Sequence, residues 1–244
     1  MQSFSSWAKL YDKISEGYKQ DVKFYNREAR KVKGKILEIA CGTGRTYLDL
    51  LKRGMDVYGI DISKEMLNVL KEKARKEGLK PKVYLKDMRN FKLKERFSLV
   101  IIPLRSYVHN LTIQDQLKTL KNIRRHLVPK GKLILSFRFP STDIILHKYG
   151  MTHEQTIKTD EGIIKIINEP ILIDQITQII ELKKSFYRKN KLICKDRIKI
   201  ALIYKREFEL LLRLAGFSKW RVYGNFNYGK LKNPNQEVVW IIQK

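Results

Sequence analysis

The chain has 244 residues with 51 lysines and arginines against 25 aspartates and glutamates, a formal net charge of +26. Hydrophobic residues make up 43% and aromatic residues 10% of it, which excludes a globally disordered chain. No apolar run approaches the roughly 20 residues that span a bilayer, and the N-terminus carries charges where a signal peptide is apolar. The composition predicts a cytoplasmic protein with one large domain, or one domain and an insertion.

The positive charge is spread along the chain. Residues 1–140 carry +18 and residues 141–244 carry +8, without a block of five or six like charges. This pattern favours a solvated surface, but it leaves a nucleic-acid partner open. The two cysteines, Cys41 and Cys194, form no CxxC pair and the four histidines are scattered, so we expect neither a disulfide framework nor a metal site.

The first 140 residues predict helices that alternate with strands. Residues 1–30 have apolar side chains at helical spacing, and later helices are expected over 45–54, 64–77 and around 117–127. Short apolar runs predict five strands, at 35–40, 56–61, 82–86, 97–103 and 132–137. Near-continuous apolar strands between helices predict a parallel sheet covered on both faces.

The pattern changes after Pro140. From 159 to 202 apolar and polar residues alternate between turn signals, which predicts three or four antiparallel strands. A last helix closed by Gly216 and two strands, 220–223 and 238–242, finish the chain. We therefore expect one α/β domain formed by residues 1–140 and 203–244, with residues 141–202 inserted as an antiparallel β cap.

Three segments in the first half carry the functional signal. The segment 36–45, ILEIACGTGR, predicts a strand, a glycine turn and a helix start, but Tyr47 replaces the third glycine of a dehydrogenase fingerprint and no P-loop lysine follows. Asp61, which ends the second strand, is placed to accept ribose hydroxyls; its alternative role is to cap the next helix, which Ser63 fills better. Asp87, at the end of the third strand, is either a turn residue or an acceptor for a purine amine.

Together, ILEIACGTGR, VYGIDIS and KDMRNF resemble, in order and spacing, the cofactor-binding motifs of class I S-adenosylmethionine-dependent methyltransferases. LVPKGKLILSF and LLRLAGF resemble later segments of the same family. The resemblance implies a Rossmann-like α/β fold with a seven-stranded, mostly parallel sheet. It also implies S-adenosyl-L-methionine as cofactor, S-adenosyl-L-homocysteine as product, and no metal.

The resemblance also implies the cofactor-binding residues. Asp61 would hold the ribose hydroxyls, Ile62 would pack on adenine, and Asp87 with Met88 would read the adenine edge. Tyr11 matches an aromatic that closes over the cofactor in relatives with a similar N-terminal helix, with Tyr18 as a weaker candidate and helix packing as the alternative for both. The other implied cofactor residues are Glu38, Ala40, Gly42, Gly44 and Leu104.

The end of the fourth strand, IIPLRSYVHN, is where an acceptor would meet the methyl group. His109 is the candidate general base, Tyr107 could orient or stack on the nucleophile, and Arg105 could bind an acceptor carboxylate or phosphate. Alternatively, Arg105 and His109 tie down a loop. The segment lacks the Asp/Asn-Pro-Pro-Tyr/Phe and Pro-Cys patterns of methyltransferases that modify nucleic-acid bases.

The antiparallel insertion resembles the cap of small-molecule methyltransferases, although a dimerisation sheet is also possible. We expect methyl transfer to a nitrogen or oxygen of a small-molecule acceptor, by a monomer or homodimer without membrane contact. The alternatives are a methyltransferase for RNA or protein, which the basic charge would suit, and a non-catalytic cofactor-binding homologue.

Overall fold

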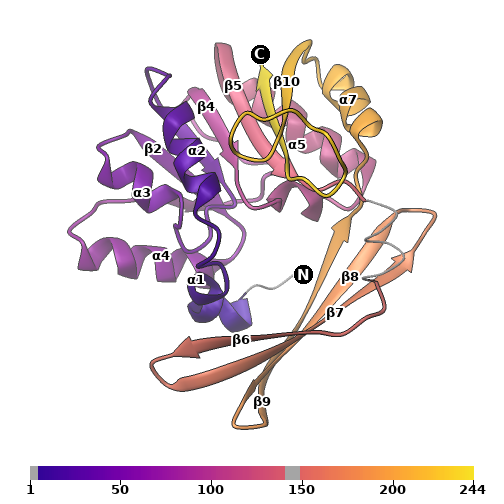
Figure 1. The fold of residues 1–244 in the computed structure, drawn as a ribbon. Coiled ribbons are helices and arrows are strands. Elements are labelled where there is room, and N and C mark those ends of the chain that lie inside the picture. The colour runs from indigo at the N-terminus through magenta and orange to yellow at the C-terminus, as the bar shows by residue number, and fades with distance from the viewer. Residues whose placement is uncertain (1–4, 141–148) are drawn as a thin grey trace.

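A computed structural model describes residues 5–140 and 149–244 and shows two sheets (Figure 1). The larger has seven strands in the order β10-β11-β5-β4-β1-β2-β3, and the smaller has four in the order β6-β7-β8-β9. The large sheet consists of β1 (Ile36–Ile39), β2 (Val57–Asp61), β3 (Lys82–Leu85), β4 (Phe97–Ile102), β5 (Leu127–Phe137), β10 (Lys219–Gly224) and β11 (Val238–Gln243).

Six strands of the large sheet run in the same direction, and only β11 runs opposite to them. β1 lies between β2 and β4, β3 pairs with β2, and β5 pairs with β4, all in parallel. β11 pairs with β5, and β10 with β11, in antiparallel register. The strand order therefore reverses between β1 and β4, and open α/β sheets bind ligands in the crevice outside the carboxyl ends at such a point.

Helices cover both faces of the large sheet, as the apolar strands predict. One buried cluster joins the sheet to α5 (Ile113–His126) and α7 (Lys205–Leu214). A second joins its other face to α2 (Gln20–Ala29), α3 (Tyr47–Lys52) and α4 (Lys64–Lys76). Figure 1 shows these two helical layers on either side of the strands, which confirms the expected Rossmann-like architecture.

The small sheet is a four-stranded antiparallel meander that extends from the large domain (Figure 1). Its strands are β6 (His153–Thr159), β7 (Gly162–Asp174), β8 (Ile179–Arg188) and β9 (Lys191–Ala201). The expected antiparallel insertion is therefore present, with four strands. The domain division at residues 140 and 203 stays a prediction, and part of the expected cap, 141–148, lies outside the described residues.

The helical expectation for the N-terminal region is confirmed over its described part, and one other helical expectation is corrected. The N-terminal region forms three pieces, the 3-10 helix η1 (Ser5–Leu10), α1 (Tyr11–Ile14) and α2; the first two pack on the small sheet and α2 packs on the large one. Leu127 is not helical: α5 ends at His126, and Leu127 starts β5 by pairing with Phe97. Among the described residues, no helix combines the length and apolarity needed to cross a membrane.

Candidate active site

A cavity of about 410 Å³ opens at the carboxyl edge of the large sheet. Its walls come from the loops that follow β1, β2, β3 and β4, and Tyr11 of α1 completes them. The cavity therefore lies where the strand order reverses. The sequence-predicted residues that line it are Tyr11, Ala40, Gly42, Asp61, Ile62, Asp87, Met88 and His109.

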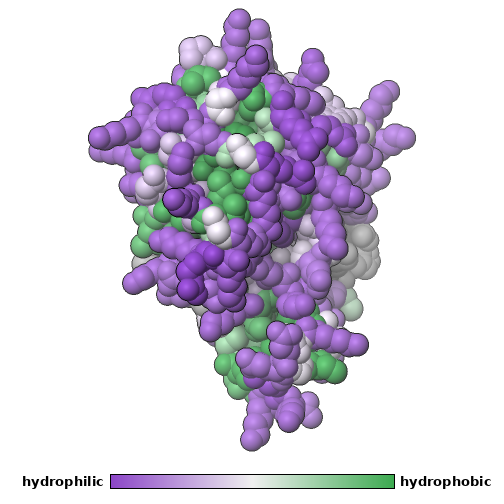
Figure 2. All heavy atoms as spheres, turned by 90° about the vertical axis from the view of Figure 1, so that its left-hand side faces the viewer, coloured by the Kyte–Doolittle hydropathy of each residue, from purple (hydrophilic) through white to green (hydrophobic). Residues whose placement is uncertain are grey.

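A larger hollow of about 730 Å³ lies on the outer helical face, between α2 and the helices α3 and α4. Figure 2 shows this side of the molecule, where hydrophilic side chains surround a patch of apolar ones. Lys19, Lys23, Arg27 and Arg30 of the α2 region line the hollow, and none of the carboxylates that end β2 and β3 reaches it. We therefore place the functional site in the smaller cavity, where the strand ends converge.

The glycine turn after β1 has two glycines with different roles. Gly42 has φ +52°, and a Cβ added there would meet no atom within 4 Å, so the backbone leaves open space beside the cavity. Gly44 has φ +88°, but a Cβ there would lie 2.8 Å from Cγ of Leu70, so this glycine allows the turn to pack on α4. Gly44 does not line the cavity.

Asp61 links the turn after β1 to the turn after β2. Its Oδ2 accepts a hydrogen bond from the Gly42 amide at 2.7 Å, and its Oδ1 accepts one from the Ser63 amide at 2.8 Å. Burial raises the pKa of Asp61 although these amides oppose the shift. Ser63 caps α4 through a bond from the Met66 amide to its Oγ, as expected. Asp61 keeps lone pairs on both oxygens, so it can also accept donors from a ligand.

Asp87 is held by an arginine that the sequence analysis did not single out. Nε of Arg89 donates to both Asp87 oxygens at 3.0 Å, and Nη1 of Arg89 reaches Oδ2 of Asp115 at 3.1 Å. Burial alone would raise the pKa of Asp87, but the hydrogen bonds and charge of Arg89 outweigh it and hold that pKa below its usual value. The sequence signal for this contact was the position of Arg89, a cation two residues after Asp87.

Glu38 lies in β1 and does not line the cavity. It is 1% exposed, and its Oε2 has no hydrogen-bond partner in the structure. Burial raises the pKa of Glu38 well above its usual value. An unpartnered buried carboxyl is costly, so this atom is ready to accept a donor from a bound group or to carry a proton.

The three predicted catalytic residues do not lie together at the cavity in the structure. His109 lines the cavity from η2 (Ser106–His109), and its Nδ1 lies 3.4 Å from the carbonyl oxygen of Lys199 in β9. Tyr107 is fully buried, and its hydroxyl donates to the Gln116 carbonyl at 3.1 Å. Only His109 of the three lies on the cavity wall; burial lowers its pKa, which favours the neutral imidazole.

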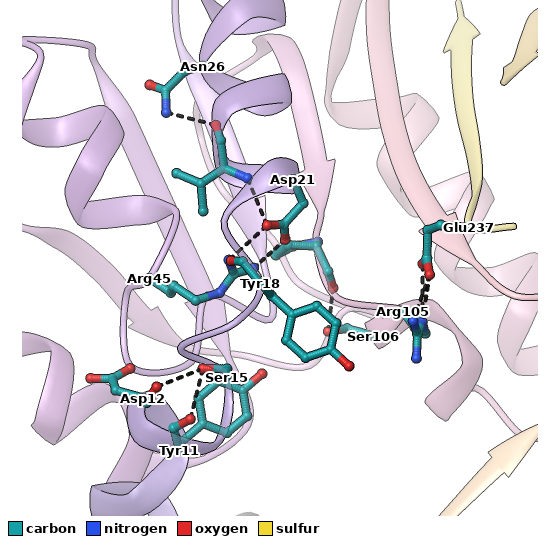
Figure 3. A network of polar contacts seen from close by, with 12 residues as sticks. Tyr11, Asp12, Ser15, Tyr18, Asp21, Asn26, Arg45, Arg105, Ser106 and Glu237 are labelled. Atoms are coloured by element: carbon teal, nitrogen blue, oxygen red, sulfur yellow. Dashed lines mark hydrogen bonds and ion pairs between the residues drawn. The ribbon is translucent and has the colours of Figure 1, made fainter. Parts of the chain in front are cut away.

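Arg105 forms an ion pair with a residue near the C-terminus of the chain. Its Nη2 lies 2.7 Å from Oε2 of Glu237, and its Nε donates to the same carboxylate (Figure 3). Oε2 of Glu237 also lies 3.4 Å from Nε of Arg138. The Tyr18 ring points toward Arg105 in Figure 3, outside the cavity wall. Tyr18, Leu104 and Arg105 do not line the cavity. Leu104 and Arg105 both have positive φ, and the chain lines the cavity again from Ser106.

Sequence reasoning missed a buried amide that organises the loop after β4. Asn110 donates to Sδ of Met88 at 3.3 Å and to the Tyr107 carbonyl at 2.9 Å, and it accepts from Oγ1 of Thr119. It thereby locks Met88, the loop and α5 together. The signal was a polar residue two positions before the Thr112 cap of α5, although no local pattern shows its partners. Within 5–140 and 149–244, no three His, Cys, Asp or Glu side chains cluster as metal ligands would.

Comparisons with known proteins agree with this geometry. Residues 36–131 match the family model described as a methyltransferase domain. A glycine/sarcosine N-methyltransferase of Halorhodospira halochloris is 34% identical over 151 residues, which are 60% of this chain and 55% of that protein. The chain spans about half the length of the curated relatives it matches.

Solved structures match nearly the whole chain. A S-adenosylmethionine-dependent methyltransferase from Clostridium acetobutylicum aligns with a TM-score of 0.80 at 20% identity, over 98% of both chains. The sugar N-methyltransferase KedS8 from Streptoalloteichus aligns with a TM-score of 0.76 at 16% identity, over 100% of this chain and 94% of that one. The fold is therefore that of the class I methyltransferases. Within it, residues 36–131 are the part that is similar to the methyltransferase-domain family.

Proposed function

We propose that the protein is an S-adenosylmethionine-dependent methyltransferase that methylates an amine nitrogen of a small molecule. The observation that carries the proposal is the cavity at the reversal of strand order, with a carboxylate at the end of β2 and another at the end of β3. Strand ends of this kind are where open α/β sheets bind nucleoside cofactors.

The residues present fit that cofactor. Asp61 retains lone pairs for ribose hydroxyls, Gly42 leaves open space where any side chain would intrude, and Ile62 is 54% exposed beside the cavity, as an apolar ring support should be. Glu38 does not line the cavity, so we propose that its unpartnered Oε2 acts through the glycine turn beside the methionyl part of the cofactor. When bound, the sulfonium supplies an electrophilic methyl group.

The charge of the cavity supports a small acceptor. Two cations, Lys86 and Arg89, line it together with the anions Asp61, Asp87 and Asp115, so the +26 excess does not converge on this site. A nucleic-acid acceptor would favour a cationic approach. Two of the similar proteins reported above are named as N-methyltransferases, one for glycine and sarcosine and one for sugars, which supports an amine nitrogen.

The chain's part in the reaction is orientation and proton removal. An attacking amine must present its lone pair in line with the methyl–sulfur bond, and its proton must leave as the new nitrogen–carbon bond forms. We propose that His109 receives this proton, directly or through one water, because it is the histidine on the cavity wall and burial favours its neutral form.

A matched pair of glycine substitutions tests the cofactor site. Gly42 and Gly54 both have positive φ, and a Cβ added at either meets no atom within 4 Å, but only Gly42 lies on the cavity. Gly42→Ala and Gly54→Ala should therefore lose similar stability, about 1 kcal/mol, by thermal unfolding. In calorimetric titrations with S-adenosylhomocysteine, only Gly42→Ala should bind more weakly than the wild type. Equal affinities for the two variants would contradict this assignment.

A further inference from the structure

The N-terminal segment 7–14, which we call the strap, lies between the small sheet and the cofactor cavity. Trp7 is 3% exposed and belongs to the apolar cluster formed by β6, β7, β8 and β9. Leu10, Tyr11 and Ile14 pack against the same cluster. The small sheet thus completes its core with residues that precede the first strand of the large sheet in sequence.

Trp7 is fixed by polar as well as apolar contacts of the small sheet. Its indole Nε1 donates to Oδ2 of Asp196 at 2.6 Å. Nζ of Lys184 lies 4.8 Å from the centre of the ring, and the Phe186 ring centre lies at 5.6 Å. Asp196 and Lys184 are cross-strand partners on β9 and β8, so a charged pair and an aromatic ring hold the indole in one orientation.

The other end of the strap reaches the cavity. The Tyr11 ring stacks on Trp7 with ring centres 5.7 Å apart and planes at 29°, and Tyr11 lines the cavity. The next residue, Asp12, accepts from Oγ1 of Thr43 at 2.5 Å in the glycine turn and from Nζ of Lys73 at 2.6 Å on α4. The strap is therefore attached to the small sheet through Trp7 and to the cofactor side through Asp12.

We propose that Trp7 is a positioning residue for the cofactor site. Asp196 of the small sheet holds the Trp7 indole by a hydrogen bond, and the indole, stacked on the Tyr11 ring, keeps Tyr11 on the cavity wall. This inference rests on the proposed function for the identity of the ligand. It makes the small sheet part of the cofactor site, although no residue of that sheet lines the cavity.

A purely structural role for Trp7 makes a different prediction. If the indole only fills the core of the small sheet, shortening it lowers the thermal stability and leaves ligand affinity unchanged. If it positions Tyr11, the ligand must reorder a displaced tyrosine and the affinity falls. In that case Tyr11 also moves more freely in the ligand-free variant than in the ligand-free wild type.

The test compares Trp7→Phe, Asp196→Asn and Trp220→Phe with the wild type in calorimetric titrations with S-adenosylhomocysteine. Trp7→Phe keeps an aromatic ring but removes the donor to Asp196, and we expect about tenfold weaker binding. Asp196→Asn keeps an oxygen that accepts from the indole, so it should stay within about threefold of the wild type. Trp220→Phe is the matched control, because Trp220 lies on β10 beside Arg213 and does not line the cavity.

Amide hydrogen exchange of residues 11–15 in the ligand-free protein is a second measurement that tests the role of Trp7. The Ser15 amide bonds to the Tyr11 carbonyl at 2.9 Å, and its exchange should become faster in Trp7→Phe but not in Trp220→Phe. Unchanged affinity in Trp7→Phe would overturn the inference. If the wild type itself binds no S-adenosylhomocysteine, the proposed function fails. The exchange measurement then still tests the role of Trp7, because an unchanged exchange rate of the Ser15 amide in Trp7→Phe overturns that role.

Discussion

Asp61 shows how one side chain serves both the fold and the site. Its two oxygens accept hydrogen bonds from backbone amides in the turns after β1 and β2, so the carboxylate connects these two turns before any ligand binds. A ligand donor then meets an oxygen that is already oriented. Preorganisation of this kind reduces the ordering cost of binding.

Replacing Asp61 should therefore remove most of the cofactor affinity. Asp61→Ala loses an acceptor for ligand hydroxyls, and hydrogen bonds to a charged group are worth about 1.5–3 kcal/mol each, so we expect binding at least about tenfold weaker by calorimetry. Asp56→Ala is the control, since Asp56 precedes β2 and forms an exposed ion pair with Lys82. Equal losses in the two variants would argue against a ligand role for Asp61.

His109 predicts a particular pH dependence of turnover. Burial lowers the pKa of His109 below its ordinary value near 6.5, so the imidazole stays neutral at pH 7 and gains its proton only at lower pH. As a general base it should keep kcat constant around neutrality and lose it as the pH falls below that value. His109→Gln should lower kcat by about 100-fold or more without changing cofactor affinity.

The control for this experiment is His153→Gln, because His153 is exposed on β6. It should leave both the rate and its pH profile unchanged. If His109→Gln retained the wild-type kcat and acid limb, the proton would have to leave by another route.

At the scale of elements, a second histidine couples stability to pH. Nδ1 of His126, at the end of α5, lies 2.8 Å from the Asn122 carbonyl, and its Nε2 lies 3.3 Å from the Leu93 amide. These partners require a neutral ring with the proton on Nδ1, because Nε2 must accept. Burial lowers the pKa of His126.

The free energy of unfolding should consequently fall as the pH falls. A group whose pKa is lower in the folded state contributes stability above its unfolded pKa near 6.5 and loses it as the pH drops through the folded value. Urea unfolding at pH 7.5 and 5.5 measures the difference. His126→Gln should be less stable at pH 7.5 and should show a smaller pH dependence; an unchanged dependence would mean that other groups control it.

The elements themselves could be predicted well where sequence patterns are local. The strands from 36 to 102, the Ser63 cap and three of the antiparallel strands, β7, β8 and β9, follow from periodicity and turn residues, whereas β6 lies before the alternating pattern begins. The break within residues 1–30 could not be predicted, because helical spacing marks an apolar face without showing what it packs on. Trp7 packs on the small sheet and Tyr25 on the large one, although both fit one helical pattern.

The same limit explains the catalytic residues. The sequence places Arg105, Tyr107 and His109 together after β4, but two successive residues with positive φ, Leu104 and Arg105, reorient the loop. The partner of Arg105 is Glu237, 132 residues away, and Tyr107 enters the core beside Phe208. No short-range motif contains such partners, so the residues that sequence places on the cavity are mainly those of the turns that directly follow β1, β2 and β3.

For the whole molecule, the central question is what the large positive charge has to do with the acceptor. The cavity is lined by cations and anions together, while a row of basic residues lies on the outer face of α2. These α2 cations therefore lie away from the cavity, and the basic residues do not converge on the proposed site, as we expect for a small acceptor.

The most direct measurement follows a labelled methyl group. The full chain is incubated with methyl-labelled S-adenosylmethionine and, separately, with metabolite, RNA and protein fractions. Our account predicts that label enters small amines of the metabolite fraction and that Asp61→Ala abolishes the transfer. Label found in RNA or protein instead, or in no fraction although the wild type binds the cofactor, would contradict it.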